Sequence, residues 1–252
     1  MLKLALVITA VLLSACGSKP ETAQKSEPAK PVEYFHVDPA TAGKLHGRIV
    51  YHGPKPARQV IDMQSDITCR QEYAGKPVYN EPVLVGKDGG LANAFVYVQA
   101  GLEGKKFEPV KETVVLDQHG CMFSPRALGV RAGQPLALRN SDKVSHNVHP
   151  VPKNNREWEE QQSPGTPDVA HRFARTEIMI PVKCNIHQWM HAYIGVVEHP
   201  YFAVTGPDGS FDLTNVPPGD YTLAVWHEKL GDQTKQVHLA ASGNEAVDFT
   251  YQ

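Results

Sequence analysis

The stretch CNIHQWMH, residues 184–191, decides the fold. It places a thiol, an imidazole and a thioether on one short loop, at the spacing C-x-x-H-x-x-M. A second imidazole stands upstream at His146, within NSDKVSHNV, residues 140–148. Soft sulfur donors together with imidazole suit copper, and a trigonal His₂Cys set with a weak axial Met is a known copper arrangement. The pattern therefore predicts a site for one copper ion, with the ligands His146, Cys184, His187 and Met190.

The order of these residues resembles the cupredoxins, blue copper proteins of the amicyanin and plastocyanin type. The resemblance rests on N-x-D and H-N-V in residues 140–148, on the C-x-x-H-x-x-M loop, and on the approach F-x-P-x-x-L-x-V-x-x-G-x-x-L-x-L-x-N in residues 123–140. It covers residues 113–199 and implies a Greek-key β-sandwich for them. It also implies that Asn147 clamps the two ligand loops together, and that His187 is the ligand nearest the surface, where the electron leaves.

Two neighbouring histidines leave the ligand set open. His191 follows Met190 directly and is an alternative fourth ligand, whose nitrogen would favour Cu(II) and lower the reduction potential. His149 is an alternative to His146, although the two side chains point to opposite faces of an extended strand. The N-x-D-x-x-x-H-N-V context favours His146.

The segments on either side of residues 113–199 are predicted to form a second β domain. Residues 44–51, KLHGRIVY, alternate apolar and polar side chains as a half-buried strand does, and residues 91–99 follow as the next strand. Farther on, a D-G turn predicts a hairpin over residues 202–213, before VPPGDYTL.

These motifs resemble the carboxypeptidase regulatory-like, transthyretin-like β-sandwich. The resemblance implies a first part in residues 43–112 and a second in residues 200–252, with the copper domain inserted in that sandwich or packed on it. Residues 54–82 are predicted to be irregular, and residues 150–175 to be a polar excursion before the strand that leads to Cys184.

Residues 1–15 resemble a bacterial lipoprotein signal peptide. A short basic start precedes an apolar run too short to span a bilayer, and the run ends in LSAC, which resembles the lipobox. The resemblance implies lipidation of Cys16 and, because Gly17 follows, anchoring in the outer membrane facing the periplasm. Residues 16–42, rich in Pro, Lys, Glu and Ser, are predicted to be a disordered tether. The alternative is an ordinary signal peptide followed by an unmodified cysteine.

Two of the four cysteines remain once Cys16 and Cys184 are assigned. In an exported protein, an oxidising compartment favours a disulfide between Cys69 and Cys121. It would close a loop of about fifty residues and contribute about 4 kcal/mol in the chain-entropy account. The alternative makes Cys121, near His119, a ligand of a second metal.

The Gly and Pro content agrees with an all-β chain, and the net charge argues against one class of partner. With 20 Gly and 20 Pro in 252 residues, short strands separated by turns are expected throughout. The formal net charge of −2 shows no basic excess, which argues against a nucleic-acid partner. The prediction is a membrane-tethered periplasmic one-electron carrier, not an enzyme, with a redox partner such as a c-type cytochrome or a dehydrogenase.

Two other functions stay open at this point. A copper-handling or storage lipoprotein is favoured by extra donors such as His149 and His191. A structural or binding module of the cell envelope is the remaining alternative, and it needs no metal.

Overall fold

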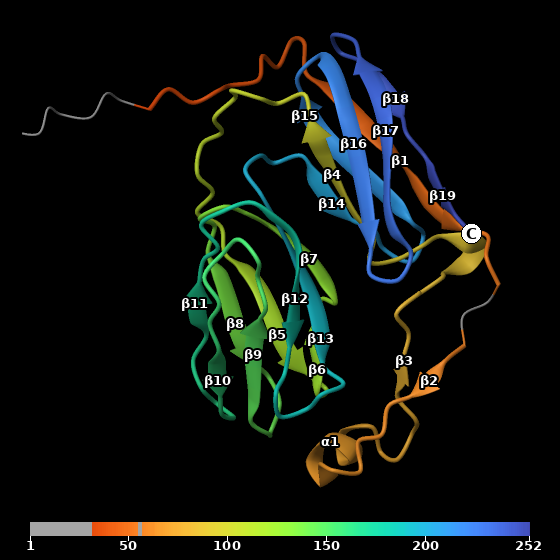
Figure 1. Ribbon diagram of the computed structural model, residues 1–252, viewed down its shortest axis with the longest axis vertical. Coiled ribbons are helices and arrows are strands. Elements are labelled where there is room, and N and C mark those ends of the chain that lie inside the picture. The colour runs from red at the N-terminus through yellow and green to blue at the C-terminus, as the bar shows by residue number, and fades with distance from the viewer. Residues whose placement is uncertain (1–31, 55–56) are drawn as a thin grey trace, which may run out of the picture. The chain divides into compact units, whose positions relative to one another are not determined.

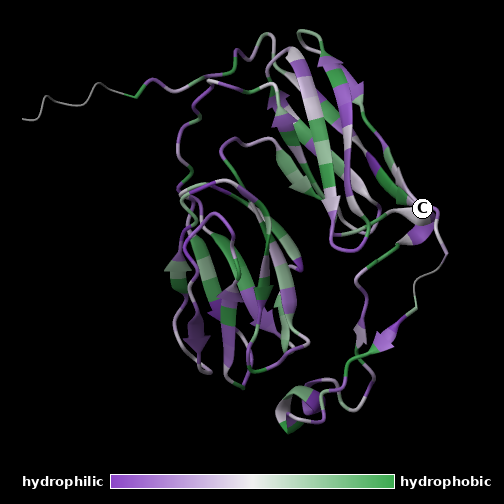
Figure 2. Cartoon of the chain, in the orientation of Figure 1, coloured by the Kyte–Doolittle hydropathy of each residue, from purple (hydrophilic) through white to green (hydrophobic). Residues whose placement is uncertain are grey.

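The computed structural model describes residues 32–54 and 57–252, which form almost only β-structure (Figure 1). The predicted signal peptide, Cys16 and most of the predicted tether lie outside the described residues. Hydrophobic and hydrophilic residues alternate along many strands, which gives a sheet one face for a core (Figure 2). Four sheets of four or five strands and one two-stranded ribbon make up the described part, so the predicted all-β class is confirmed.

One sandwich, called the flanking sandwich below, takes its strands from both sides of the central segment. One of its sheets has the order β15-β1-β18, with β19 also paired to β1, and the other has the order β14-β4-β16-β17. Apolar side chains from both sheets share one buried cluster. Its strands are β1 (Gly43–Tyr51), β4 (Phe95–Ala100), β14 (Phe202–Val204), β15 (Ser210–Val216), β16 (Gly219–His227), β17 (Gly231–Leu239), β18 (Asn244–Ala246) and β19 (Phe249–Tyr251).

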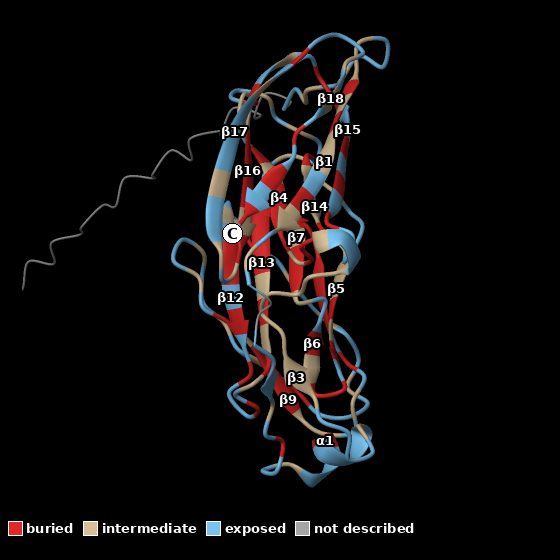
Figure 3. Ribbon diagram, turned by 90° about the vertical axis from the view of Figure 1, so that its right-hand side faces the viewer, coloured by how far each residue is buried: buried red, intermediate tan, exposed pale blue. Residues whose placement is uncertain are grey.

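The second sandwich, called the central sandwich, holds the predicted ligands. Its sheets have the orders β10-β9-β12-β13-β7 and β11-β8-β5-β6, and both contribute to one buried cluster. Figure 3 shows β7 and β13 as mainly buried strands. The strands are β5 (Val114–His119), β6 (Met122–Ser124), β7 (Ala127–Arg131), β8 (Leu136–Asn140), β9 (His146–Pro150), β10 (Glu160–Gln162), β11 (Val169–His171), β12 (Glu177–Lys183) and β13 (His191–Val197).

A pair of glycines lets the two sandwiches pack closely. Gly129 on β7 and Gly195 on β13 are direct partners across the ladder. A Cβ on Gly195 would lie 2.5 Å from the ring of Phe95 on β4, and a Cβ on Gly129 would lie 2.4 Å from the ring of Phe202 on β14. The missing side chains therefore leave the space that these aromatic rings fill.

A third region, called the cap, comprises residues 57–82. It contains the ribbon of β2 (Gln59–Val60) and β3 (Tyr79–Asn80) and the short helix α1 (Ile67–Glu72); the 3₁₀ turn η1 (Lys87–Gly89) follows it. Most of this segment is irregular, as predicted, but the ribbon and α1 are not. Asp66 caps α1 by accepting hydrogen bonds from two backbone N–H groups. None of the described residues forms a helix long and apolar enough to cross a membrane.

Two further expectations about local structure need revision. Residues 202–213 do not form a hairpin: β14 pairs with β4 and β15 pairs with β1, so the D-G turn carries the chain from one sheet to the other. The N–H of Thr205 donates to the Ala94 carbonyl beside β4, and the N–H of Ile49 in β1 donates to the Gly209 carbonyl. These bonds attach the two ends of the turn to different sheets. The polar excursion of residues 150–175 supplies two edge strands, β10 and β11, one for each sheet of the central sandwich.

Candidate metal centre

The ligand loop lies between two strands of the five-stranded sheet. β12 ends at Lys183 and β13 begins at His191, and these two residues pair across the antiparallel ladder. Two backbone hydrogen bonds close the loop: Met190 N–H donates to the His187 carbonyl (3.0 Å), and Cys184 N–H donates to the Met190 carbonyl (3.3 Å). The closure fixes Cys184, His187 and Met190 on one tight turn.

The second loop ends at His146, the first residue of β9, which runs antiparallel beside β12. The side chain of Asn140 stabilises this loop through two hydrogen bonds. Its side-chain amide donates to the Val144 carbonyl (2.9 Å), and its Oδ1 accepts from the N–H of Asp142 (3.0 Å). The position of the His146 ring is therefore set by hydrogen bonds within its own loop as well as by the strand.

Asn147 joins the two loops. The N–H of Asn185 donates to Asn147 Oδ1 (2.6 Å), and the N–H of Asn147 points at the sulfur of Cys184 (3.5 Å). Both contacts are to the loop that carries Cys184, so Asn147 keeps the two ligand-bearing segments in register.

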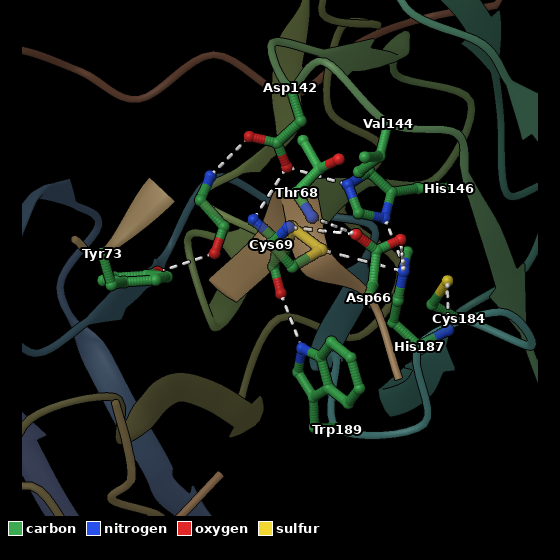
Figure 4. Close-up of a disulfide and its surroundings, with 12 residues drawn as sticks. Asp66, Thr68, Cys69, Tyr73, Asp142, Val144, His146, Cys184, His187 and Trp189 are labelled. Carbon is green, nitrogen blue, oxygen red and sulfur yellow. Dashed lines mark hydrogen bonds and ion pairs between the residues drawn. A yellow bond between two sulfur atoms is a disulfide. The ribbon is translucent and has the colours of Figure 1, made fainter. Parts of the chain in front are cut away.

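Three donor atoms meet where the loops face each other (Figure 4). The Nδ1 atoms of His146 and His187 lie 2.9 Å apart, and a nitrogen of each ring lies within 4.8 Å of Cys184 Sγ. The N–H of His187 also donates to that sulfur (3.3 Å). All three residues are 0–2% exposed, and Met190, fully buried, belongs to the same apolar cluster as Cys184. The structure thus brings the two predicted nitrogens and the thiol together, and Met190 is buried on the same loop as Cys184.

Carboxylates hold the outer nitrogens of both rings. His146 Nε2 lies 2.8 Å from Asp142 Oδ2, and His187 Nε2 lies 3.2 Å from Asp66 Oδ2. Burial tends to raise the pKa of Asp142, but the bond with His146 and two backbone N–H groups outweigh it and lower that pKa. The pKa of Asp66 is lowered chiefly by the N–H of Cys69. Both groups are therefore charged at neutral pH.

This arrangement tests whether a metal fits. A charged carboxylate only accepts hydrogen bonds, so each histidine carries a proton on Nε2. Two Nδ1 lone pairs cannot face each other at 2.9 Å, so either a proton on one Nδ1 atom or a metal ion must lie between them. Two imidazoles and one thiolate, with the thioether of Met190 on the same loop, form the set of donors that suits copper.

The protonation states of Cys184 and His146 also favour binding of a cation. Burial raises the pKa of the Cys184 thiol, but hydrogen bonds with His146 and then His187 outweigh it and lower that pKa to about 5. Burial lowers the pKa of His146, whereas its bonds with Asp142 and Cys184 raise it to about 9. The site therefore holds a thiolate and an imidazolium at neutral pH, and an entering metal ion displaces a proton.

The two alternative histidines lie elsewhere. His149 sits against Glu157, with 2.6 Å between Nε2 and the carboxylate, and its other nitrogen faces Asn185. His191, the first residue of β13, pairs with Lys183 of β12 and lies near the charged side chains of Arg126 and Glu228. Neither histidine belongs to the group of donors around Cys184 among the described residues.

The cap covers the site. Even His187, the ligand expected nearest the surface, has a side chain only 3% exposed, and Asp66 of the cap lies against it. A disulfide of 2.05 Å joins Cys69 in α1 to Cys121, just before β6. Trp189 completes the cover: its ring lies 5.0 Å from that of His187, and its Nε1 donates to the Cys121 carbonyl (3.0 Å).

Asp66 and Asp142 were not identified from the sequence as part of the site. Asp142 belongs to the N-x-D motif that marked the first loop, so its position was a usable signal. Asp66 stands three residues before Cys69, and the suspected disulfide linked that segment to Cys121. Neither signal says that a carboxylate reaches a histidine ring, because that contact depends on where the cap lies.

No model of a known protein family matches the sequence, and no curated protein matches it. Solved structures with partial similarity include a copper-containing nitrite reductase from Thermus scotoductus SA-01. At 19% identity and a TM-score of 0.32, that match covers 40% of this chain and 25% of the reductase, about a quarter of its length.

Two smaller proteins show similar scores. A purple cupredoxin from Nitrosopumilus maritimus matches at 18% identity and a TM-score of 0.29, over 34% of this chain and 99% of its own. A mutant of amicyanin in the Cu(I) form matches at 19% identity and a TM-score of 0.29, over 33% of this chain and 81% of its own. The function proposed below rests on the donor atoms of this chain.

Proposed function

We propose that the central sandwich binds one copper ion through His146, Cys184, His187 and Met190, and that the protein is a one-electron carrier. The observation that carries the proposal is the meeting of one nitrogen from each histidine with the sulfur of Cys184 within 4.8 Å, in a buried place on the loop that also carries Met190. A bound copper ion supplies a centre that accepts and releases one electron. All four donors come from the chain, so no coordination position is left open for a substrate, and we propose a carrier and not an enzyme.

The surrounding residues suit this role because they keep the donors still. Both ligand segments lie in or between strands of one sheet, Asn147 links them, and the ligand loop is closed by its own backbone bonds. Burial of the three donor residues excludes water. A rigid, dry set of donors limits the rearrangement that accompanies a change in oxidation state.

The test is a visible spectrum of the copper-loaded protein. We expect an intense thiolate-to-copper band that is lost in Cys184→Ser. The matched control is His149→Gln, which removes an imidazole from the same strand as His146, outside the group of donors, and should leave the band in place. A colourless copper-loaded protein, or a band that survives in Cys184→Ser, would contradict the proposal.

We also infer, from the sequence motifs, that the protein is a lipoprotein of the periplasm whose flanking sandwich is transthyretin-like. Lipidation of Cys16 would hold the carrier at the outer membrane within reach of a redox partner, such as a c-type cytochrome or a dehydrogenase. Fatty-acid labelling in cells should mark the wild-type protein and fail in Cys16→Ser. Equal labelling of both would exclude the anchor.

The storage alternative depends on His149 and His191 as additional donors. Among the described residues, neither histidine belongs to the group of donors around Cys184, so the carrier is the function favoured here.

A further inference from the structure

Each histidine of the proposed site is connected to one half of the disulfide (Figure 4). On one side, the N–H of Cys69 donates to Asp66 Oδ1 (3.0 Å), and Asp66 Oδ2 contacts His187. On the other side, the N–H of Cys121 donates to Asp142 Oδ2 (2.8 Å), which also contacts His146. The disulfide is therefore the start of two hydrogen-bonded paths, each of which runs from a cysteine N–H through a carboxylate to a histidine ring.

The role of Asp66 exceeds that of a helix cap. A single oxygen, Oδ1, accepts both capping bonds, from Thr68 (2.8 Å) and Cys69 (3.0 Å). The second oxygen is left for the ring of His187, at 3.2 Å. Asn or Ser would cap the helix as well, so the helix alone does not require a carboxylate here.

The second carboxylate is fixed just as firmly. The Oδ1 of Asp142 accepts from the N–H of Gly120 (2.6 Å), and its side chain is 6% exposed. Because Cys121 follows Gly120 directly and donates to Oδ2, two adjacent backbone N–H groups beside the disulfide hold both oxygens of Asp142. Neither carboxylate can turn away from its histidine without breaking bonds to the backbone beside the cross-link.

We propose that Asp66 and Asp142 are positioning residues that orient His187 and His146 and lower the reduction potential of the bound copper, with the disulfide holding both in place. The inference rests on the proposed function. A carboxylate on the outer N–H makes an imidazole a more basic ligand and fixes its orientation. Greater basicity and the added negative charge favour Cu(II) over Cu(I), so removing either carboxylate raises the potential.

The experiment uses two substitutions in the full, disulfide-bonded protein, and both keep an oxygen for the helix cap. In Asp66→Asn that oxygen caps α1 and an NH₂ group, which cannot accept from a ring N–H, faces His187. Asp66→Ser is too short to reach His187. Loss of an outer partner weakens metal binding about tenfold to a hundredfold. We expect the ratio of Cu(II) to Cu(I) affinity to fall about tenfold, which raises the potential by about 59 mV for one electron. Asp142→Asn should shift it in the same direction.

The matched control is Glu157→Gln. It removes a carboxylate from another histidine of the same sheet, His149, at the comparable distance of 2.6 Å. Its potential should equal that of the wild type, which separates loss of the specific contact from loss of a nearby negative charge. If the Asp66 variants keep the potential of this control, the inference is overturned.

A second readout needs no copper. In the metal-free protein, a hydrogen-bonded ring N–H of His187 should give a downfield proton resonance that is lost in both Asp66→Asn and Asp66→Ser. Its absence from the wild type would also overturn the inference. Absence of the thiolate-to-copper band in the wild type would instead refute the proposed function, while this resonance would still decide whether the carboxylate holds the ring.

Discussion

Replacing both Cys69 and Cys121 by Ser should destabilise the protein strongly while leaving the donors to copper in place. The disulfide joins residues 52 apart in sequence, and closing a loop of that length contributes about 4 kcal/mol through the unfolded chain. That is about a thousandfold in the unfolding equilibrium. No proposed ligand is removed, so the copper band should persist.

The change should also be local in a measurable way. Without the cross-link, the cap is held by weaker contacts such as the bond from Tyr73 Oη to the Gly120 carbonyl (2.6 Å) and the packing of Met63. Amide hydrogens of α1 should therefore lose more protection against exchange than those of β12 and β13. Global stability is measured by urea denaturation of the copper-free protein.

Reduction of the wild-type disulfide provides the control, because it removes the cross-link without changing the sequence. The reduced protein should match the double variant in both measurements. A double variant as stable as the oxidised wild type, or equal exchange rates in α1 before and after the change, would refute the reasoning.

Three further changes test the packing and charges of the two sandwiches. Glu228→Gln leaves the nearly buried guanidinium of Arg126 without its counter-charge and should cost about 3 kcal/mol in thermal unfolding. Gly195→Ala places a methyl group against the ring of Phe95 and should cost about 1–3 kcal/mol. Burial lowers the pKa of His227 to about 4, so the unfolded chain, titrating near 6.5, takes up the proton first as the pH falls. Stability should therefore fall by about 3 kcal/mol between pH 6.5 and 4 on this account, and His227→Asn should flatten that decline in urea denaturation curves.

Each of these predictions has a clear contrary result. Arg139→Ala removes an exposed ion pair with Asp168 and should change stability by less than about 1 kcal/mol; if it costs as much as Glu228→Gln, burial is not the cause. Full stability of the Gly195 variant would show that the contact with Phe95 relaxes easily. An unchanged acid decline in His227→Asn would assign that decline to other groups.

The sequence predicted the class of fold and the donors because both leave local patterns. Alternating strands and frequent turns indicated an all-β chain, and the spacing of Cys184, His187 and Met190 placed three donors on one loop. The link to His146 came from a family resemblance, since strand pairing across the sheet leaves no local trace.

Features that depend on distant segments were not predicted. The bond of Thr205 with Ala94 turns the expected hairpin into a crossing between sheets, and both partners lie in sequence that looks ordinary. The burial of His187 follows from the position of the cap, which is attached more than a hundred residues upstream. The contact of Asp66 with that ring has the same origin.

The pairing of Tyr97 with Phe202 has a consequence for how such a chain can arise. Strands β4 and β14 are antiparallel neighbours, so to the flanking sandwich the hundred or so residues between them amount to one very long hairpin loop. A short turn could bridge the same two strand ends. Gaining or losing the whole intervening segment would therefore leave the ladder between β4 and β14 unbroken.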